Sequence, residues 1–381
     1  MYNSFVMKSI LKFFRNETVL CVAFVLALLS CFFVQPDRTY IDYIDYRTLC
    51  ILLCLMITMA GLQKLLLFRQ IGECLVRRMS SIRGVVVILM FLCFFSSMWI
   101  TNDVALITFV SFSITTLTLA KRKDLYIPVI VLDTVAANLG SMLTPLGNPQ
   151  NLYLYSKAGL SFLSFIGMML PYTLLSLLLL VIATLIFVKK EALEAPAKNT
   201  YRRSRRDKAL MVLYLLYFLL SLLAVVRLMD YRIVFFLILG SVLLTDRRVL
   251  RNPDYSLLFT FIFLFVFIGN MKRIPALNDL LYELIRQREV MVSVILSQFI
   301  SNVPTAILCS GFTERIPELI IGTNLGGLGT LIASMASLIS FKQYGYVEGS
   351  DKKRYLALFT VMNLVFLAIL LLFHYLFAVR I

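Results

Sequence analysis

Two stretches of the sequence, DTVAANLGSMLTPLGNPQNLYLY (133–155) and GTNLGGLGTLIASMASLISFKQY (322–344), decide the expected fold. Each contains the string Asn-Leu-Gly inside an apolar run, and each has a threonine six residues after that asparagine. A helix broken at such a point frees backbone groups that lipid cannot satisfy, so the break must line a cavity or find polar partners. We therefore expect a pair of broken transmembrane helices, one in each half of an internally repeated chain.

The composition supports a membrane protein. Of the 381 residues, 60% are hydrophobic and 15% are charged, whereas a soluble domain is about 25% charged. A transmembrane helix needs about 20 apolar residues. We expect an all-α polytopic protein of the cell inner membrane, with its first helix at 18–34 rather than a cleavable signal peptide. The expected apolar spans are 18–34, 48–62, 84–100, 105–120, 126–146, 162–188, 209–228, 233–244, 257–270, 290–312, 316–341 and 355–379.

The formal net charge of +16 would suggest nucleic acid as a partner if the chain were soluble. Here the basic residues lie in short connections between apolar spans, as the positive-inside rule requires, so we exclude nucleic-acid binding. The chain has seven cysteines without a Cys-x-x-Cys pair, and its single histidine is His374. This pattern predicts neither a metal site nor a cofactor.

The Lys and Arg residues in the loops also indicate how the chain is expected to cross the membrane. Residues 63–83 carry five Lys or Arg and residues 121–123 carry three. A single crossing through 84–120 would leave one of these clusters outside the cell, against the positive-inside rule. We therefore expect 84–120 to form a re-entrant hairpin that turns at 101–103, and 290–312 to form a second hairpin that opens outward.

A long polar segment, KKEALEAPAKNTYRRSRRDK (189–208), divides the chain near its middle. It predicts a basic cytoplasmic linker between an N-terminal transmembrane half, 1–188, and a C-terminal half, 209–381. The threading gives the two halves opposite directions in the membrane. The expected architecture is therefore two inverted repeats, each with a re-entrant helical hairpin and a broken transmembrane helix.

Beside the two stretches quoted first, the strings TNDVALITF (101–109) and SQFISNVPTAIL (297–308) carry a family resemblance. The chain resembles the ion transporter superfamily, and within it the citrate-transporter-like permeases of the arsenite permease and sodium–proton antiporter branch. Divalent anion–sodium symporters are more distant relatives, in which Ser-Asn-Thr strings at two hairpin tips bind sodium and a substrate carboxylate. Here the hydroxyl residue and the asparagine carry over to both tips, and the final threonine does not.

The tips and breaks are where we expect substrate or ions to bind. Broken helix ends offer free carbonyls to a cation and free N–H groups to an anion, and Asn and Thr side chains supply further contacts. The alternative is that the asparagines only join helices and the glycines only allow close packing. The candidate binding residues are Thr101, Asn102, Asp103, Asn138, Gly140, Thr144, Asn148, Ser301, Asn302, Thr323, Asn324, Gly326 and Thr330.

Asp103 and Asp133 are the acidic residues inside the apolar spans of the first half. A carboxylate is costly within a membrane and is functional by default. We expect these two residues to couple a cation or a proton, and sodium is a further candidate at the hairpin tips; the alternative is a carboxylate that caps a broken helix. Lys342 ends an apolar span and is expected to extend toward the membrane surface.

These features predict a secondary active transporter and not an enzyme, because no His, Cys or Ser–base constellation lies at membrane depth and no Walker A motif is present. The expected cargo is a small anion (a carboxylate, arsenite or another oxyanion), coupled to sodium or protons by alternating access as one hairpin-and-broken-helix unit rocks against the rest. A sodium–proton antiporter is the alternative, and an ion channel a further one. The expected partners are the lipid bilayer, the transported ion and, from the distant symporters, a second copy in a homodimer.

Overall fold

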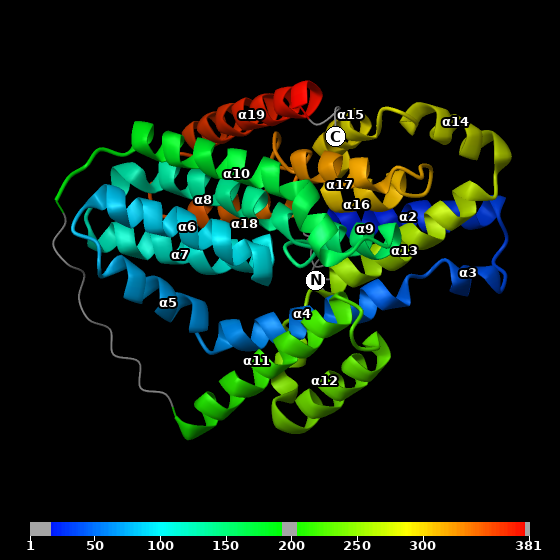
Figure 1. The fold of residues 1–381 in the computed structure, drawn as a ribbon, viewed down its shortest axis with the longest axis horizontal. Helices are drawn as coiled ribbons and strands as arrows, with labels where there is room; N and C mark the ends of the chain where they lie inside the picture. Colours follow the sequence, from blue (N-terminus) through cyan, green and yellow to red (C-terminus); the bar gives the residue numbers. More distant parts are fainter. Residues whose placement is uncertain (1–16, 193–203, 378–381) are drawn as a thin grey trace, which may run out of the picture.

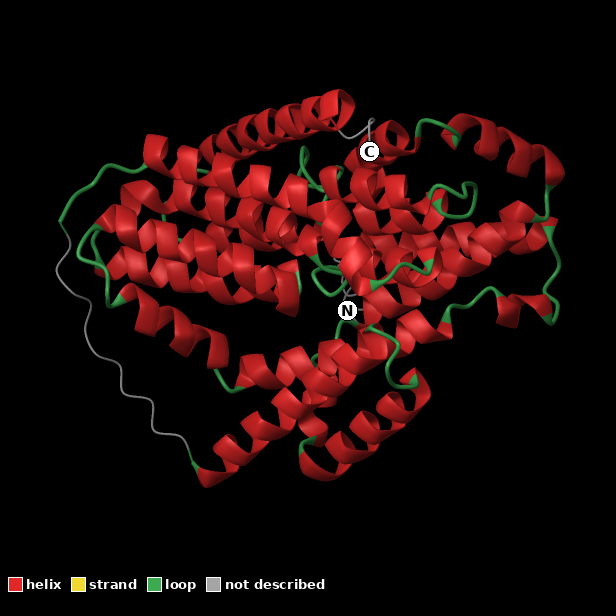
Figure 2. Cartoon of the chain, in the orientation of Figure 1, coloured by secondary structure: helices red, strands yellow, loops and turns green. Residues whose placement is uncertain are grey.

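The computed structural model describes residues 17–192 and 204–377 (Figure 1). Helices make up the regular structure of these residues, and the two β-bridge partners Ser81 and Ala192 are isolated (Figure 2). The predicted all-α class is confirmed.

Eight helical segments of the described ranges are long and apolar enough to cross a membrane, which confirms a polytopic membrane protein. They are α4 (Tyr46–Lys64), α6 (Ile82–Ile100), α7 (Asn102–Leu119), the continuous segment Lys123–Leu143 that contains α8 (Tyr126–Gly140), α10 (Phe162–Phe187), α11 (Arg205–Val225), α13 (Tyr255–Lys272) and α19 (Lys352–Phe377). Shorter apolar helices are α2 (Thr18–Phe33), α12 (Tyr231–Thr245) and α15 (Glu289–Ile300).

Both predicted hairpins are present. In the first, α6 and α7 pack along each other and Thr101 alone separates them. In the second, Ser301 alone separates α15 from α16 (Asn302–Cys309), and these helices also pack together. The two turn residues have nearly the same backbone angles, φ 70° and ψ 149° at Thr101 and φ 72° and ψ 156° at Ser301. The chain therefore reverses in the same way at both tips.

Both predicted helix breaks are present as well. The first lies between α8 and α9 (Pro149–Ala158), with a short 3-10 turn, Ser141–Leu143, inside it. Pro149 occupies the first turn of α9, where a missing N–H costs nothing. The second break lies between α17 (Ile316–Leu325) and α18 (Met335–Gly345).

The helix that follows each break packs against helices of the other half of the chain. We call α6 to α9 the first unit and α15 to α18 the second unit. Helix α9 of the first unit packs against α16 and α17 of the second, and α18 of the second packs against α7 and α8 of the first. In Figure 1, α18 accordingly lies among α6, α7 and α8, while α9 lies beside α16 and α17. The two units are therefore interlocked.

The flanking helices repeat in the same order. The amphipathic helix α5 (Leu67–Val76) precedes the first hairpin, and the amphipathic helix α14 (Pro275–Ile285) precedes the second. Only Ile285 of α14 is buried, as in an amphipathic segment, and the predicted place of 272–289 at the membrane surface stays a prediction. A helix of 26 residues follows each unit, α10 after the first and α19 after the second.

Contacts between loops give the relative direction of α4 and α13. Lys64 ends α4 and forms an ion pair of 2.8 Å with Asp246, which precedes α13. Arg273 follows α13 and forms an ion pair of 2.7 Å with Asp37, which precedes α4. These two helices therefore run in opposite directions, as an inverted repeat requires. The orientation of the two halves in a membrane stays a prediction.

The predicted linker is shorter than expected at its end. Helix α11 begins at Arg205 because Ser204 caps it and Asp207 completes a capping box, so residues 205–208 form its first turn. The start of the linker is fixed to the first unit, since the Ile82 amide donates to the Glu191 carbonyl at 2.9 Å. Residues 193–203 lie outside the described residues.

Candidate functional site

Asn138, near the end of α8, contacts the second unit. Its Nδ2 donates to Ser337 Oγ at 3.2 Å, and its Oδ1 accepts from Ser334 Oγ at 3.0 Å. All three side chains are buried. Ser334 and Ser337 lie 10 and 13 residues after Asn324, the asparagine of the second break.

Asn324 makes the matching contacts with the first unit. Its Nδ2 donates to Asn151 Oδ1 at 2.6 Å, and its Oδ1 accepts from Asn148 Nδ2 at 3.2 Å. Asn148 and Asn151 lie 10 and 13 residues after Asn138. Each break therefore places its asparagine against the same two positions of the other unit. We call these two sets of contacts the crossing bridges.

The hairpin tips are fixed to the breaks by equivalent backbone bonds. The Asn102 amide donates to the Gly147 carbonyl at 3.0 Å, and the Asn302 amide donates to the Ala333 carbonyl at 3.0 Å. The Asn102 side chain also reaches the first crossing bridge, because its Nδ2 donates to Asn138 Oδ1 at 3.2 Å. The structure thus brings both predicted tip asparagines next to the non-helical segments of the breaks.

Gly140 and Gly326 allow the hairpins to approach the breaks closely. A Cβ at Gly140 would overlap the Phe94 carbonyl oxygen, and a Cβ at Gly326 would lie 2.7 Å from Ser297 Oγ. Both glycines have right-handed helical backbone angles. Their role is therefore close approach and not unwinding.

The predicted threonines lie beside the crossing bridges and do not join them. The Thr144 hydroxyl donates to the Met98 carbonyl, and the Thr330 hydroxyl donates to the Gln298 carbonyl at 3.0 Å. These bonds tie each break to the first helix of its own hairpin, although Thr330 is exposed. The Thr323 hydroxyl donates to the Leu319 carbonyl at 2.6 Å, within α17.

A cavity of about 380 Å³ lies beside the tips. Asp103 and Ser301 line it from the two hairpins, Asp254 from the start of α13, Glu17 from the start of α2, and Lys342 from α18. The described lining residues thus include three carboxylates and one ammonium group. Lys342 is exposed and lines this cavity, and its extension toward the membrane surface stays a prediction.

Asp133 lies apart from this cavity. It is fully buried in α8, where Ser113 Oγ of α7 donates to its Oδ2 at 2.6 Å. Its Oδ1 has no hydrogen-bond partner among the described residues. The structure therefore does not bring Asp133 together with Asp103. Among the described residues, no cluster of three or more His, Cys, Asp or Glu side chains could hold a metal ion.

A sequence profile of the citrate transporter family matches residues 5–314. The chain belongs to this family. The resemblance inferred from the tips and breaks is thereby confirmed, and this member of the citrate transporter family is a membrane transporter.

Individual relatives agree with the family assignment. The inner membrane protein YbiR of Escherichia coli is 30% identical over 321 residues, which cover 82% of this chain and 84% of YbiR. An uncharacterized transporter of Methanocaldococcus jannaschii is 34% identical over 266 residues, 68% of this chain and 71% of the relative. A silicon efflux transporter of Oryza sativa is 30% identical over 139 residues, 36% of this chain and 28% of the relative.

Several residues at the centre of this citrate transporter family member were not predicted from its sequence. Asn151, Ser334 and Ser337 complete the crossing bridges, and Asp254 and Glu17 line the cavity. A signal for the first three exists, because both halves carry polar residues 10 and 13 positions after the asparagine of the break. Asp254 and Glu17 each stand directly before a helix, α13 and α2. An acidic residue at such a position reads in the sequence as a helix cap, with no sign of a binding role.

Proposed function

We propose that this chain is a secondary active transporter that moves a small carboxylate or oxyacid together with sodium or protons. The observation that carries this proposal is the cavity at the hairpin tips, which is lined by Asp103, Asp254, Glu17 and Lys342. An excess of negative charge in a cleft with low-dielectric walls concentrates cations. The same cavity offers one ammonium group and the Ser301 hydroxyl to an acidic or hydroxylated cargo.

Asp103 is the residue that we assign to the coupling cation. It lies two residues after the tip residue Thr101, in the first turn of α7, and the second tip contributes Ser301 to the same cavity. Carbonyl oxygens at unwound helix segments coordinate sodium in transporters built from broken helices. A carboxylate beside such oxygens serves sodium as a ligand and serves a proton as an acceptor.

The crossing bridges suggest how access alternates. Rocking one unit against the other would separate Asn138 and Asn324 from their partners, and each buried group left without a partner costs about 1–3 kcal/mol. We therefore infer, in place of such rocking, that the two units move as one body against α2, α4 and α11 to α13. A disulfide between Thr134→Cys and Ser340→Cys, whose hydroxyls bond across the units at 2.8 Å, should leave transport intact; blocked transport would contradict this movement.

A sodium–proton antiporter is the second candidate. It is favoured by the same excess of carboxylates over basic groups in the cavity, because sodium and protons would compete for one acidic site. In that case the chain needs no cofactor and no anionic cargo.

The expected homodimer stays a prediction, and cross-linking in native membranes would test it.

The deciding experiment measures proton flux in proteoliposomes that contain wild type, Asp103→Asn or the control Asp124→Asn, whose carboxylate is largely exposed. Sodium, citrate, succinate and arsenite are added in turn, with silicic acid because one relative is named a silicon efflux transporter. Saturable flux with one cargo, dependent on sodium or protons and lost only in Asp103→Asn, supports the main proposal.

Sodium-evoked proton efflux without any cargo, lost in the same variant, supports the antiporter. Wild-type flux in Asp103→Asn would remove that residue from the coupling site under either proposal.

A further inference from the structure

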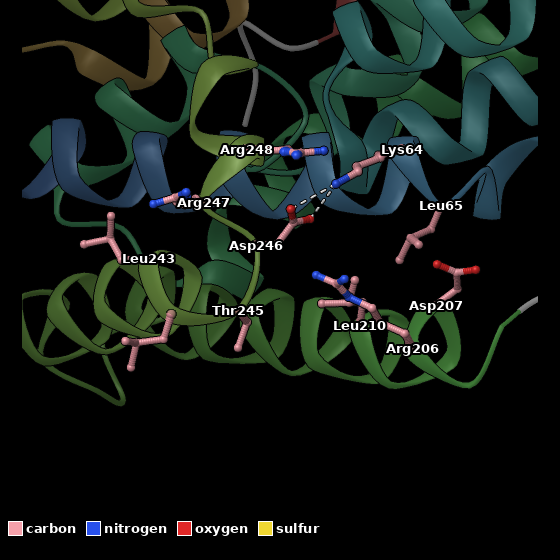
Figure 3. Close-up of a pocket in the computed structure, with 11 residues that line it drawn as sticks. Lys64, Leu65, Arg206, Asp207, Leu210, Leu243, Thr245, Asp246, Arg247 and Arg248 are labelled. Carbon is pink, nitrogen blue, oxygen red and sulfur yellow. Dashed lines mark hydrogen bonds and ion pairs between the residues drawn. The ribbon is translucent and has the colours of Figure 1, made fainter.

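A second cavity, of about 530 Å³, lies away from the hairpin tips. It is formed where α4 ends, α11 begins, and α12 passes into the 3-10 helix η3 (Arg247–Arg251) (Figure 3). Its lining residues are Lys64, Leu65, Arg206, Asp207, Leu210, Leu243, Leu244, Thr245, Asp246, Arg247 and Arg248.

This cavity is lined by more basic side chains than its two carboxylates can neutralise. Asp246 is buried and accepts from Lys64 Nζ at 2.8 and 3.0 Å, the bonds drawn as dashed lines in Figure 3, and from Tyr214 OH at 3.0 Å. Asp207 is engaged in the capping box at the start of α11. The structure therefore pairs the two carboxylates internally.

Three arginines remain around the cavity. The side chains of Arg206, Arg247 and Arg248 have no ion-pair or side-chain hydrogen-bond partner among the described residues. In Figure 3, Arg206 extends from α11 toward the space beside Asp246, and Arg248 lies near Lys64. Arginine binds phosphate oxygens with two parallel N–H groups, so a phosphate is the anion that this arrangement best fits.

Apart from Thr245, the rest of the cavity wall consists of leucine side chains, and the cavity opens to the surroundings. Leu210, Leu243 and Leu244 contribute to it, and Leu244 is 89% exposed. The cavity lies at the ends of α4 and α11, which are long and apolar enough to cross a membrane, so it lies where the headgroups of a bilayer are expected. A ligand with a phosphate at one end and hydrocarbon at the other would satisfy the arginines and the leucines together.

We propose that this cavity binds an anionic phospholipid, with its headgroup phosphate on Arg206, Arg247 and Arg248 and its acyl chains along Leu243 and Leu244. Basic pockets between transmembrane helices on the cytoplasmic side bind anionic headgroups in this way. The bound lipid joins the end of α4 to the connection between α12 and η3. The same phosphate chemistry is available from free phosphate, so the experiment compares both sources.

The test compares purified full-length wild type with the triple variant Arg206→Gln, Arg247→Gln, Arg248→Gln. A matched control replaces three exposed basic residues at the start of α19, Lys352→Gln, Lys353→Gln and Arg354→Gln. Binding of phosphatidylglycerol, cardiolipin, phosphatidylcholine and inorganic phosphate is measured by native mass spectrometry and by the shift in melting temperature in detergent.

We expect anionic lipid to bind and stabilise wild type and the control variant, and phosphatidylcholine to do neither. The affinity of the triple variant for anionic lipid should fall roughly 100-fold, since each interfacial Lys or Arg contributes several-fold to such binding. Equal lipid binding in the triple variant, or an equal loss in the control, would overturn the proposal. Stabilisation by inorganic phosphate alone, with no added effect of lipid, would reassign the cavity to a free anion.

Discussion

The two hairpin tips hold residues in a backbone conformation that is otherwise almost confined to glycine. Thr101 has φ 70° and ψ 149°, and Ser301 has φ 72° and ψ 156°. A non-glycine residue in this region costs about 1–3 kcal/mol and persists only where the surroundings impose it. We therefore predict that Thr101→Gly and Ser301→Gly each stabilise the fold and impair transport.

The magnitude follows from what each substitution removes. The Thr101 hydroxyl makes no hydrogen bond within the described residues, and the Ser301 hydroxyl makes only long contacts of 3.4 and 3.5 Å. Relief of about 1–3 kcal/mol is offset by about 0.4–1 kcal/mol, because glycine makes the unfolded chain more flexible. The expected gain in the free energy of unfolding is about 0.5–2 kcal/mol at each tip.

The assay pairs SDS-induced unfolding in mixed micelles with transport in proteoliposomes. Thr101→Ala and Ser301→Ala keep the strained Cβ and lose the hydroxyl, so they should impair transport without the gain in stability. Leu66→Gly is the control, because Leu66 also has a positive φ, 55°, but lies outside both units. It should stabilise the fold and leave transport unchanged. A loss of stability in the tip glycine variants would refute the strain argument, and wild-type transport in them would refute a role for the hydroxyls.

Three further predictions concern the breaks and the threading. Asn324→Ala should lower the free energy of unfolding by about 1–3 kcal/mol in the same titration, because Asn151 Oδ1 loses its donor in a buried site; an unchanged value would contradict the crossing bridge. Gly140→Ala should destabilise by about 1–3 kcal/mol through overlap with backbone, whereas Gly240→Ala, with open space around it, should stabilise by about 0.5–1 kcal/mol. A cysteine at Lys352 should react with an impermeant maleimide only from the cytoplasmic side, and labelling from outside would overturn the threading.

Much of this site could be predicted because its signals are local. Pro149 after Asn148 favours the start of a new helix, each Asn-Leu-Gly string lies at the end of the helix before a break, and the basic segments around 84–120 argue against a single crossing. The hairpin turn at Thr101 and the break before Pro149 therefore lie where the sequence placed them. The second tip, at Ser301, followed from its likeness to the first.

The partners across the units could not be predicted, because they depend on a tertiary exchange. Ser334 and Ser337 look like ordinary small polar residues in an apolar run until α18 is placed against α8. For the same reason Asp133 and Asp103, both predicted to couple ions, differ in setting. One lies in the packed interior of the first unit and the other in the wall of a cavity.

The exchange of α9 and α18 also has a consequence for how a substrate site can be built from two repeats. If each broken helix stayed within its own unit, the asparagines of the breaks would have to be satisfied locally, and the two tips would be free to separate. Asn138 and Asn324 instead bond to the opposite unit, and under the proposed movement these bonds would hold the two tips at a fixed distance. On the movement proposed above, Asp103 of one tip and Ser301 of the other would travel together, while Asp254 and Glu17, which line the same cavity from α13 and from the start of α2, would move relative to them.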